Sequence, residues 1–285
     1  MRRFATLTLL GLSVGGLVGC DQKPPPVIGA KPIEQSKAEE VEFKPPARPD
    51  TSDKAARQLL DEMLAAHTGG KPEKLSALKE CSFTRKGIAD TPVGRLTAVW
   101  KRDVVWPDNY RIRLETSDTS GNTTTQTYAL RGPEAWYQLG DGNKKDKLPA
   151  GLVPNLKSQY HEDCVTLLFV LADPKTVAAG GPADKLGEKE LATVDVWTPT
   201  GQHARLGIDT KTKLLTKVVY VGQEAETQQT SYTVTKELTF QEYKEFAGVK
   251  LGSKMFAQTR AKPLGEWTDL TVETTKPDAK VFDGP

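Results

Sequence analysis

The chain has 285 residues, of which 39 are Lys or Arg and 37 are Asp or Glu, so its formal net charge is +2. The basic residues form no long block, which disfavours electrostatic capture of nucleic acid or of anionic lipid. Hydrophobic residues make up 37% of the chain, a modest share that suits a sheet with one face in water.

The amino terminus has the order of a secretory signal. Arg2 and Arg3 give a positive start, an apolar run follows, and the run ends in Leu17-Val18-Gly19-Cys20. The run is shorter than the roughly 20 apolar residues of a membrane-spanning helix. The pattern therefore predicts a signal peptide over residues 1–19, cut between Gly19 and Cys20. The alternatives are an ordinary cleaved signal with an incidental cysteine and an uncleaved anchor.

The end of this segment resembles a bacterial lipobox. The resemblance implies that Cys20 carries a thioether-linked diacylglycerol and usually a third acyl chain on its amine. Two or more chains make a stable anchor, because each buried methylene contributes about 0.8 kcal/mol. We therefore expect a lipid-anchored protein of the bacterial cell envelope that faces the periplasm, with the choice between inner and outer membrane left open.

Residues 20–50 are predicted to form a lipidated, proline-rich tether. Proline removes a backbone donor and the segment has little to bury, so we expect it to be extended. At about 3.1 Å per residue, it could hold the folded part up to about 90 Å from the bilayer. The prolines are Pro24, Pro25, Pro26, Pro32, Pro45, Pro46 and Pro49.

Residues 51–285 are expected to form one domain that begins with a helix. Thr51-Ser52-Asp53 suits a helix cap, and Gly69-Gly70 suits its end. Between them, apolar residues recur at helical spacing. These are Ala55, Ala56, Leu59, Leu60, Met63 and Leu64. The stretch Pro72 to Leu78 predicts a second, short helix.

From Cys81 onward the hydrophobic period changes to two, which is typical of strands. Strands are predicted at 96–101, 110–115, 123–130 and 135–139, and later at 191–198, 203–208, 214–221, 230–240, 249–259 and 267–274. The middle differs: 154–172 predicts one or two helices, and 178–187 predicts a loop.

About ten strands joined by short turns predict an antiparallel meander. A single curved sheet can bury its inner face on the helices. The fold class is thus mainly β (α+β): an unclosed half-barrel wrapped around one long N-terminal helix and a mid-chain helical segment. No internal repeat of 20 to 50 residues is found, which disfavours a propeller or solenoid.

Three short motifs and the chain's end resemble the periplasmic lipoprotein-carrier and lipoprotein-receptor superfamily, which includes outer-membrane lipoprotein-sorting proteins. The motifs are Trp106-Pro107-Asp108-Asn109-Tyr110-Arg111, Leu130-Arg131-Gly132-Pro133-Glu134-Ala135-Trp136-Tyr137 and Leu206-Gly207-Ile208-Asp209-Thr210-Lys211-Thr212, and the chain closes on Val281-Phe282. The resemblance covers roughly residues 53 to 283. It implies an unclosed barrel whose apolar cavity shelters a lipid or lipoprotein acyl chain. The long tether and the Gly-rich stretch near residue 180 depart from the compact carriers.

This resemblance implies a pocket lined by Leu96, Trp100, Ile112, Leu114 and Met255. Core packing is the alternative for each of them, because pocket-lining and core residues look alike in sequence.

The cysteines and histidines offer little chemistry. Cys81 and Cys164 could form a disulfide in an exported compartment, or be two separate buried thiols. His161 and Cys164 are three residues apart and could bind a metal or form a thiol–imidazole pair, but an exposed histidine beside a structural cysteine is the simpler interpretation. The sequence Gly11 to Gly15 matches a nucleophile elbow, but it lies in the signal and is discarded.

The sequence contains no typical motif of an enzyme, a cofactor site or a metal site, so we expect neither catalysis nor a cofactor. The main hypothesis is a tethered half-barrel that binds an apolar ligand without catalysis. The alternative is a structural or protein-interaction module of the cell envelope, whose protein partner the sequence does not identify.

Overall fold

The computed structural model describes residues 43–91, 94–142, 144–199, 201–225, 231–259 and 262–285. The predicted signal peptide, Cys20 and most of the tether lie outside these residues. Within them, none of the helices combines the length and the apolar character needed to cross a membrane.

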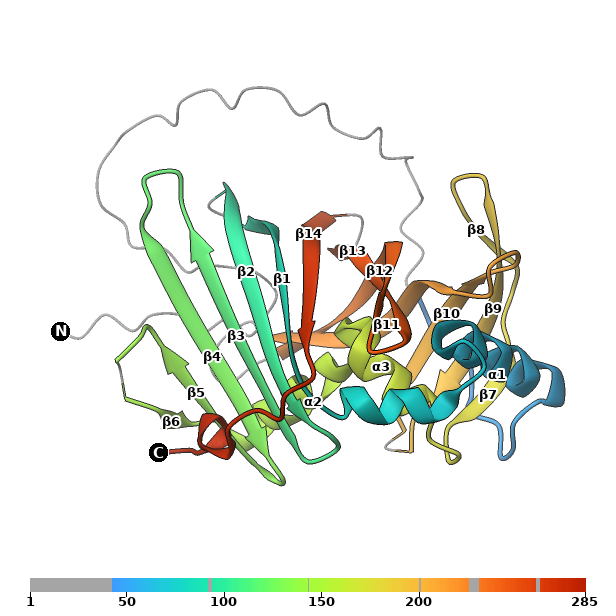
Figure 1. The fold of residues 1–285 in the computed structure, drawn as a ribbon, viewed down its shortest axis with the longest axis horizontal. Coiled ribbons are helices and arrows are strands. Elements are labelled where there is room, and N and C mark those ends of the chain that lie inside the picture. The colour runs from blue at the N-terminus through green and yellow to red at the C-terminus, as the bar shows by residue number, and fades with distance from the viewer. Residues whose placement is uncertain (1–42, 92–93, 143, 200, 226–230, 260–261) are drawn as a thin grey trace.

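Across the described residues, fourteen strands form one antiparallel sheet whose two edges do not meet (Figure 1). The order along the sheet is β6-β5-β4-β3-β2-β1-β14-β13-β12-β11-β10-β9-β7, and β8 pairs with β9. The strands are β1 (Glu80–Thr91), β2 (Gly94–Val105), β3 (Asn109–Ser117), β4 (Thr123–Arg131), β5 (Glu134–Leu139), β6 (Asp146–Lys147), β7 (Val177–Gly180), β8 (Asp184–Leu186), β9 (Lys189–Trp197), β10 (His203–Asp209), β11 (Leu215–Ala225), β12 (Ser231–Phe246), β13 (Val249–Thr259) and β14 (Lys262–Glu273).

The first and last strands of the chain lie side by side in the middle of the sheet. β1 pairs with β14, with Phe83 opposite Val272 and Ala89 opposite Gly265. This pairing joins two wings, one built from β1–β6 and the other from β7–β14 (Figure 1). A simple meander would have left these two strands at opposite edges, so the sheet combines two meanders rather than one.

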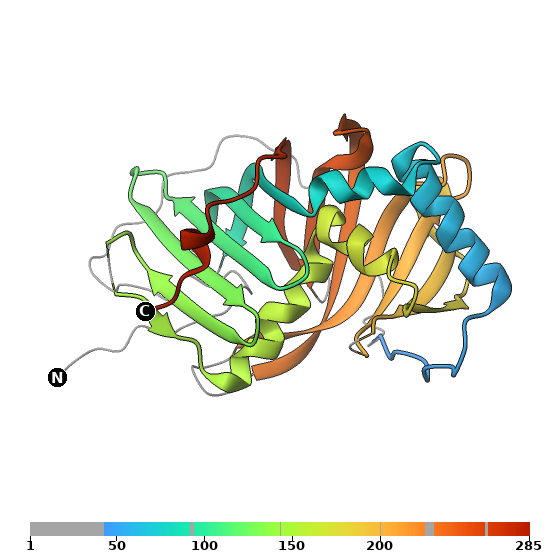
Figure 2. The ribbon, with the colours of Figure 1, turned by 60° about the horizontal axis from the view of Figure 1, so that its bottom comes forward.

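The leading helix α1 (Lys54–Thr68) forms as the sequence predicts. The side chain of Asp53 accepts a hydrogen bond from the amide of Ala56 at 3.0 Å, and Gly69 ends the helix in the left-handed conformation. Its buried stripe, which includes Leu60 and Met63, packs over β7, β9 and β13 (Figure 2).

His67 fastens the last turn of α1 to two strands. Its Nε2 accepts a hydrogen bond from the amide of Leu215 at 3.0 Å, so Nδ1 carries the proton and donates it to the carbonyl of Lys250 at 2.6 Å. Burial lowers the pKa of His67 to about 4, because desolvation penalises the charged ring. The ring is therefore neutral at physiological pH.

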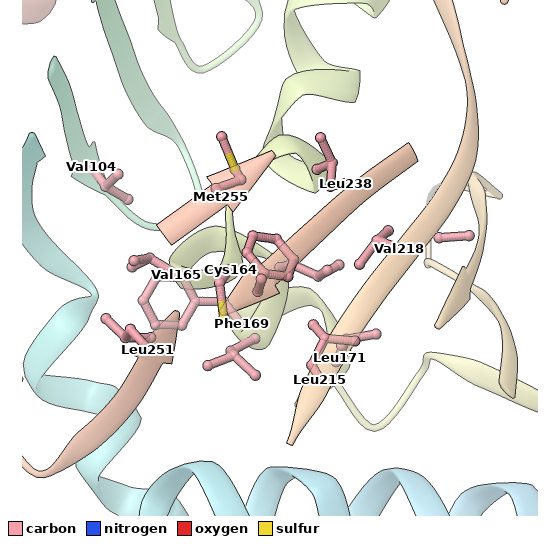
Figure 3. Close-up of a cluster of buried hydrophobic side chains, with 14 of the residues drawn as sticks. Val104, Cys164, Val165, Phe169, Leu171, Leu215, Val218, Leu238, Leu251 and Met255 are labelled. Atoms are coloured by element: carbon pink, nitrogen blue, oxygen red, sulfur yellow. The ribbon is translucent and has the colours of Figure 1, made fainter. Parts of the chain in front are cut away.

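The mid-chain helices fill the concave face of the sheet as a helical plug, defined here as α2 (Val153–Ser158), η3 (Gln159–Glu162) and α3 (Cys164–Leu171). All eight residues of α3 are buried, as expected for a helix that is apolar on every side. Figure 3 shows Phe169 and Leu171 of α3 among Leu215, Leu251 and Met255 of the sheet.

The first described residue and the C-terminal segment pack on the outer face of the sheet, away from the plug. Phe43 stacks on His203 with ring centroids 5.5 Å apart, and the guanidinium of Arg205 lies 4.9 Å from the centre of the Phe43 ring. At the other end, η4 (Ala279–Phe282) crosses β3 and β4, and the indole of Trp136 donates to the carbonyl of Phe282 at 2.9 Å (Figure 2). Phe43 and the C-terminal segment are thus held against the domain.

The prediction of a mainly β, unclosed half-barrel around helices is confirmed, but two of its details are wrong. The strand count is fourteen across the described residues rather than about ten. The predicted loop at 178–187 contains most of β7 and all of β8. The sequence of β7 is Val-Ala-Ala-Gly and β8 has only three residues, so neither strand shows a clear apolar alternation. The predicted second helix is the 3₁₀ helix η1 (Pro72–Leu78).

Candidate functional site

A small crevice lies between the concave face of the sheet and the helical plug. Its volume is about 30 Å³, which is room for about two water-sized groups. Side chains from both wings form its apolar walls, and η3 closes its floor. The lining residues are Trp100, Leu114, Glu162, Tyr220, Lys236, Leu238, Met255, Ala257, Leu264 and Trp267.

Two tryptophans dominate one wall of the crevice. The rings of Trp100 on β2 and Trp267 on β14 have centroids 5.4 Å apart. The indole of Trp267 fits here because Gly265 has no side chain: a Cβ at that position would lie 2.5 Å from Cη2 of the indole and 2.6 Å from the carbonyl oxygen of Ile88. The glycine thus lets the ring lie flat against the strand.

The floor of the crevice is charged. Oε1 of Glu162 accepts hydrogen bonds from the hydroxyl of Tyr220 at 3.0 Å and from Nζ of Lys236 at 2.9 Å. Glu162 belongs to η3, whereas Tyr220 and Lys236 belong to the neighbouring strands β11 and β12. The contacts therefore fasten the plug to the sheet, and a buried carboxylate needs such partners.

Arg102 lies beside this group and is fully buried, with 0% of its surface exposed. Its Nη2 is 3.7 Å from Oε2 of Glu162, and its Nη1 donates to the carbonyl of Gln159 over 3.4 Å. Both distances exceed the usual range for a hydrogen bond. The guanidinium carbon lies 3.6 Å from the centre of the Trp100 ring, so this side chain also makes a cation–π contact.

Arg85 contrasts with Arg102, because its donors are well placed. Its Nε donates to Asp163 at 2.9 Å, and its terminal nitrogens donate to the carbonyls of Ser253 and Gly252 at 3.1 and 2.9 Å. Asp163 also caps α3 by accepting from the amide of Val165 at 2.8 Å. This network fixes the start of α3 against β1 and β13.

A second hollow, the rim groove, lies where the plug meets the turns at one end of the half-barrel. Its volume is about 510 Å³, within the range of small-molecule sites. It is lined by Trp106, Pro107, Asp108, Leu130, Gly132, Pro133, Lys157, Val170, Asp173, Thr198, Pro199 and Gln202. Parts of two sequence motifs that carry the family resemblance therefore lie in this groove.

The structure brings three of the five predicted pocket residues to the crevice. Trp100, Leu114 and Met255 line it, whereas Ile112 is fully buried in the adjoining core. Leu96 is half-buried on β2 and lies outside the lining. The charged members of the site were missed, although Arg102 and Lys236 stand at positions that the two-residue period assigns to the inner face.

The cysteines are two separate thiols. Cys81 and Cys164 are both buried and free, so the disulfide interpretation does not match the structure. Burial, reinforced by the negative charge of Asp163, raises the pKa of each thiol to about 12, which leaves neither as a thiolate nucleophile at neutral pH. The side chain of His161 lies outside what the structure describes. Within the described residues, no three His, Cys, Asp or Glu side chains gather as a metal site.

No protein-family model and no curated protein matches the sequence. Among solved structures, a LolA superfamily protein from Nitrosomonas europaea matches with a TM-score of 0.49 at 8% identity, covering 80% of this chain and 97% of that chain. A putative outer membrane lipoprotein-sorting protein domain from Vibrio parahaemolyticus matches with a TM-score of 0.48 at 11% identity, covering 81% and 97%. A DUF1329 family protein from Desulfovibrio piger matches with a TM-score of 0.49 at 13% identity, covering 82% and 98%.

Proposed function

We propose that this chain is a lipid-anchored protein of the bacterial cell envelope that binds an apolar ligand, a lipid or lipoprotein acyl chain, without transforming it. The observation that supports this most is the crevice on the concave face. Both wings of the sheet supply apolar walls there, and the plug covers them without filling the space. Apolar concave sites with a few placed polar groups are the usual form of a ligand site.

Binding of a whole acyl chain requires the plug to move. The crevice of about 30 Å³ holds only one end of such a ligand, whereas small-molecule sites span about 300–1,000 Å³. The contacts that hold η3 against the sheet run through Glu162, and those that hold α3 run through Asp163. A ligand that separates the plug from β12 and β13 would extend the crevice along the inner face.

The anchor belongs to the same proposal. Cys20 would carry the lipid chains, and residues 21–42 would link them to the domain at Phe43. The contacts of Phe43 with His203 and Arg205 set the point at which this link leaves the sheet. The ligand site would then face the periplasm at the end of a tether.

Two measurements test ligand binding on the chain from Asp21 onward, which retains every described residue. Solvent extraction of the protein purified from cells, followed by mass spectrometry, is expected to recover lipid, and a fluorescent fatty acid is expected to bind the delipidated protein. Ala257→Leu fills the crevice and should weaken uptake at least tenfold. Gln258→Leu, the next residue on the opposite face of β13, is the control. Neither lipid nor uptake in the unmodified protein would refute the proposal.

The rim groove supports a second candidate, a protein-interaction module. It is larger than the crevice and opens at the strand turns. A photo-crosslinking residue at Gln202 would capture a protein partner in cells, whereas one at Thr268 on β14 would not. Such capture, together with absence of bound lipid, would favour this function over the first.

A further inference from the structure

Buried hydrogen-bond donors without a partner gather around Trp100, a lining residue of the crevice, and they outnumber the one such acceptor beside Arg102, Oε1 of Gln159. Nε of Arg102 and the indole Nε1 atoms of Trp100 and Trp267 are buried and have no hydrogen-bond partner within the described part of the chain. The exposed fractions of these residues are 0%, 5% and 3%. A buried donor without an acceptor is unfavourable, because it has lost its hydrogen bonds to water. Three such donors at one place point to a missing acceptor.

Among the described residues, the carboxylate that forms an ion pair with Arg102 is also bound by a lysine. Arg102 and Lys236 share the carboxylate of Glu162, and Lys236 holds the shorter contact, at 2.9 Å against 3.7 Å. The other carboxylate on the plug, Asp163, is taken by Arg85 at 2.9 Å. The guanidinium of Arg102 is therefore left short of a counter-ion, and an uncompensated buried charge is strongly unfavourable.

Aromatic rings compensate only part of this deficit. The face of the Trp100 ring meets the guanidinium at 3.6 Å, and the Tyr110 and Phe83 rings lie 5.7 and 5.9 Å away. Contact with a ring face attracts the cation but does not supply an acceptor for N–H groups at the guanidinium edge. The site thus offers a positive charge and several donors at the end of an apolar wall.

We infer that the crevice binds an acyl chain that ends in a carboxylate and enters head first, with the carboxylate accepting hydrogen bonds from Arg102, Trp100 and Trp267. This inference rests on the proposed function and specifies its ligand as a fatty acid. A carboxylate is small enough for a space of about 30 Å³. The hydrocarbon tail then follows the walls past Leu238 and Leu264, the second of which is only half-buried.

The head group is tested by comparing dodecanoic acid with dodecanol, which have the same chain length. For the chain from Asp21 onward, titration is expected to show that the acid binds at least tenfold more tightly. Arg102→Met should remove this preference. Trp267→Phe keeps an aromatic ring but loses the N–H group, and it should reduce the preference for the acid. This variant replaces Arg102→Met in the test if Arg102→Met does not fold. Two matched controls on the outer face, Arg111→Met and Trp136→Phe, should retain the preference.

The orientation is tested with brominated acids, because bromine quenches tryptophan fluorescence on contact. A head-first ligand predicts stronger quenching by 2-bromododecanoic acid than by 12-bromododecanoic acid. That quenching should be reduced in Trp267→Phe, in which Trp100 remains, and unchanged in Trp136→Phe. Stronger quenching by the 12-bromo acid would overturn the orientation. Equal affinity for acid and alcohol would overturn the inference and leave the proposed function standing, whereas absence of binding by both would overturn the two together.

Discussion

Protonation of His67 should destabilise the fold in a defined pH range. The neutral ring joins α1 to β11 and β13 by accepting from the amide of Leu215 and donating to the carbonyl of Lys250. A proton on Nε2 would place two donors face to face and break the first of these bonds. Lowering the pH therefore tests this contact. His67→Gln is the control variant, because the glutamine side chain does not titrate.

The size of the effect follows from the two pKa values of His67. Burial lowers its pKa to about 4 in the folded protein, against 6.5 for the ordinary side chain. As pH falls below about 6.5, the unfolded chain takes up a proton that the folded chain refuses, so stability is lost between about 6.5 and 4 and is fully present above that range. At about 1.4 kcal/mol per pH unit, the whole loss is about 3.5 kcal/mol, and about 2.5 kcal/mol of it has occurred by about pH 4.5.

Urea unfolding at pH 7.5 and pH 4.5 measures this contribution. Carboxylates also titrate over this range, so the quantity of interest is the change in the free energy of unfolding of the wild type minus that of His67→Gln. We expect the wild type to lose about 2.5 kcal/mol more than the variant. Equal losses in the two proteins would show that His67 does not have a lowered pKa and that the tautomer argument is wrong.

Three further substitutions test the packing. Arg85→Met leaves the carboxylate that caps α3 unpaired and should cost about 3–5 kcal/mol in urea unfolding, whereas the half-buried Arg113→Met should cost under about 1 kcal/mol; equal costs would contradict the role of the network. Gly265→Ala should cost about 1–3 kcal/mol by overpacking and alter the near-UV circular dichroism of the tryptophans, while Gly180→Ala, with open space around it, should do neither. Phe282→Ala should cost about 3–5 kcal/mol, because this ring is 1% exposed; an unchanged unfolding midpoint would show that the C-terminal segment does not contribute to the fold.

Much of the fold could be predicted from helix-capping residues and hydrophobic periodicity. The cap at Asp53 and the left-handed Gly69 bound α1, and clean alternation such as Tyr110, Ile112 and Leu114 identified β3. β7 was missed because its sequence, Val-Ala-Ala-Gly, has small residues in place of alternation. Its pairing with β9, which the sequence does not encode locally, makes it a strand.

Long-range contacts explain what the sequence did not reveal. The pairing of β1 with β14 joins residues nearly 200 positions apart, as Ser82 opposite Glu273 illustrates, and no turn geometry fixes that register. For a similar reason, the sequence predicts the walls of the crevice but not its floor. Its apolar walls follow from the strand period, and Arg102 and Lys236 could have been noticed as charges at inward positions. Their shared partner Glu162 comes from the plug, which only the folded chain places there.

Photolabelling with a fatty acid tests the central claim most directly. A chain bearing a photoactivatable diazirine is bound to the protein, irradiated, and located by mass spectrometry of peptides. Labels that peptide fragmentation assigns to the inner-face residues Leu238, Met255 or Trp267 are the result we predict. Labels confined to outer-face positions such as Phe256, or no specific labelling, would contradict ligand binding inside the half-barrel.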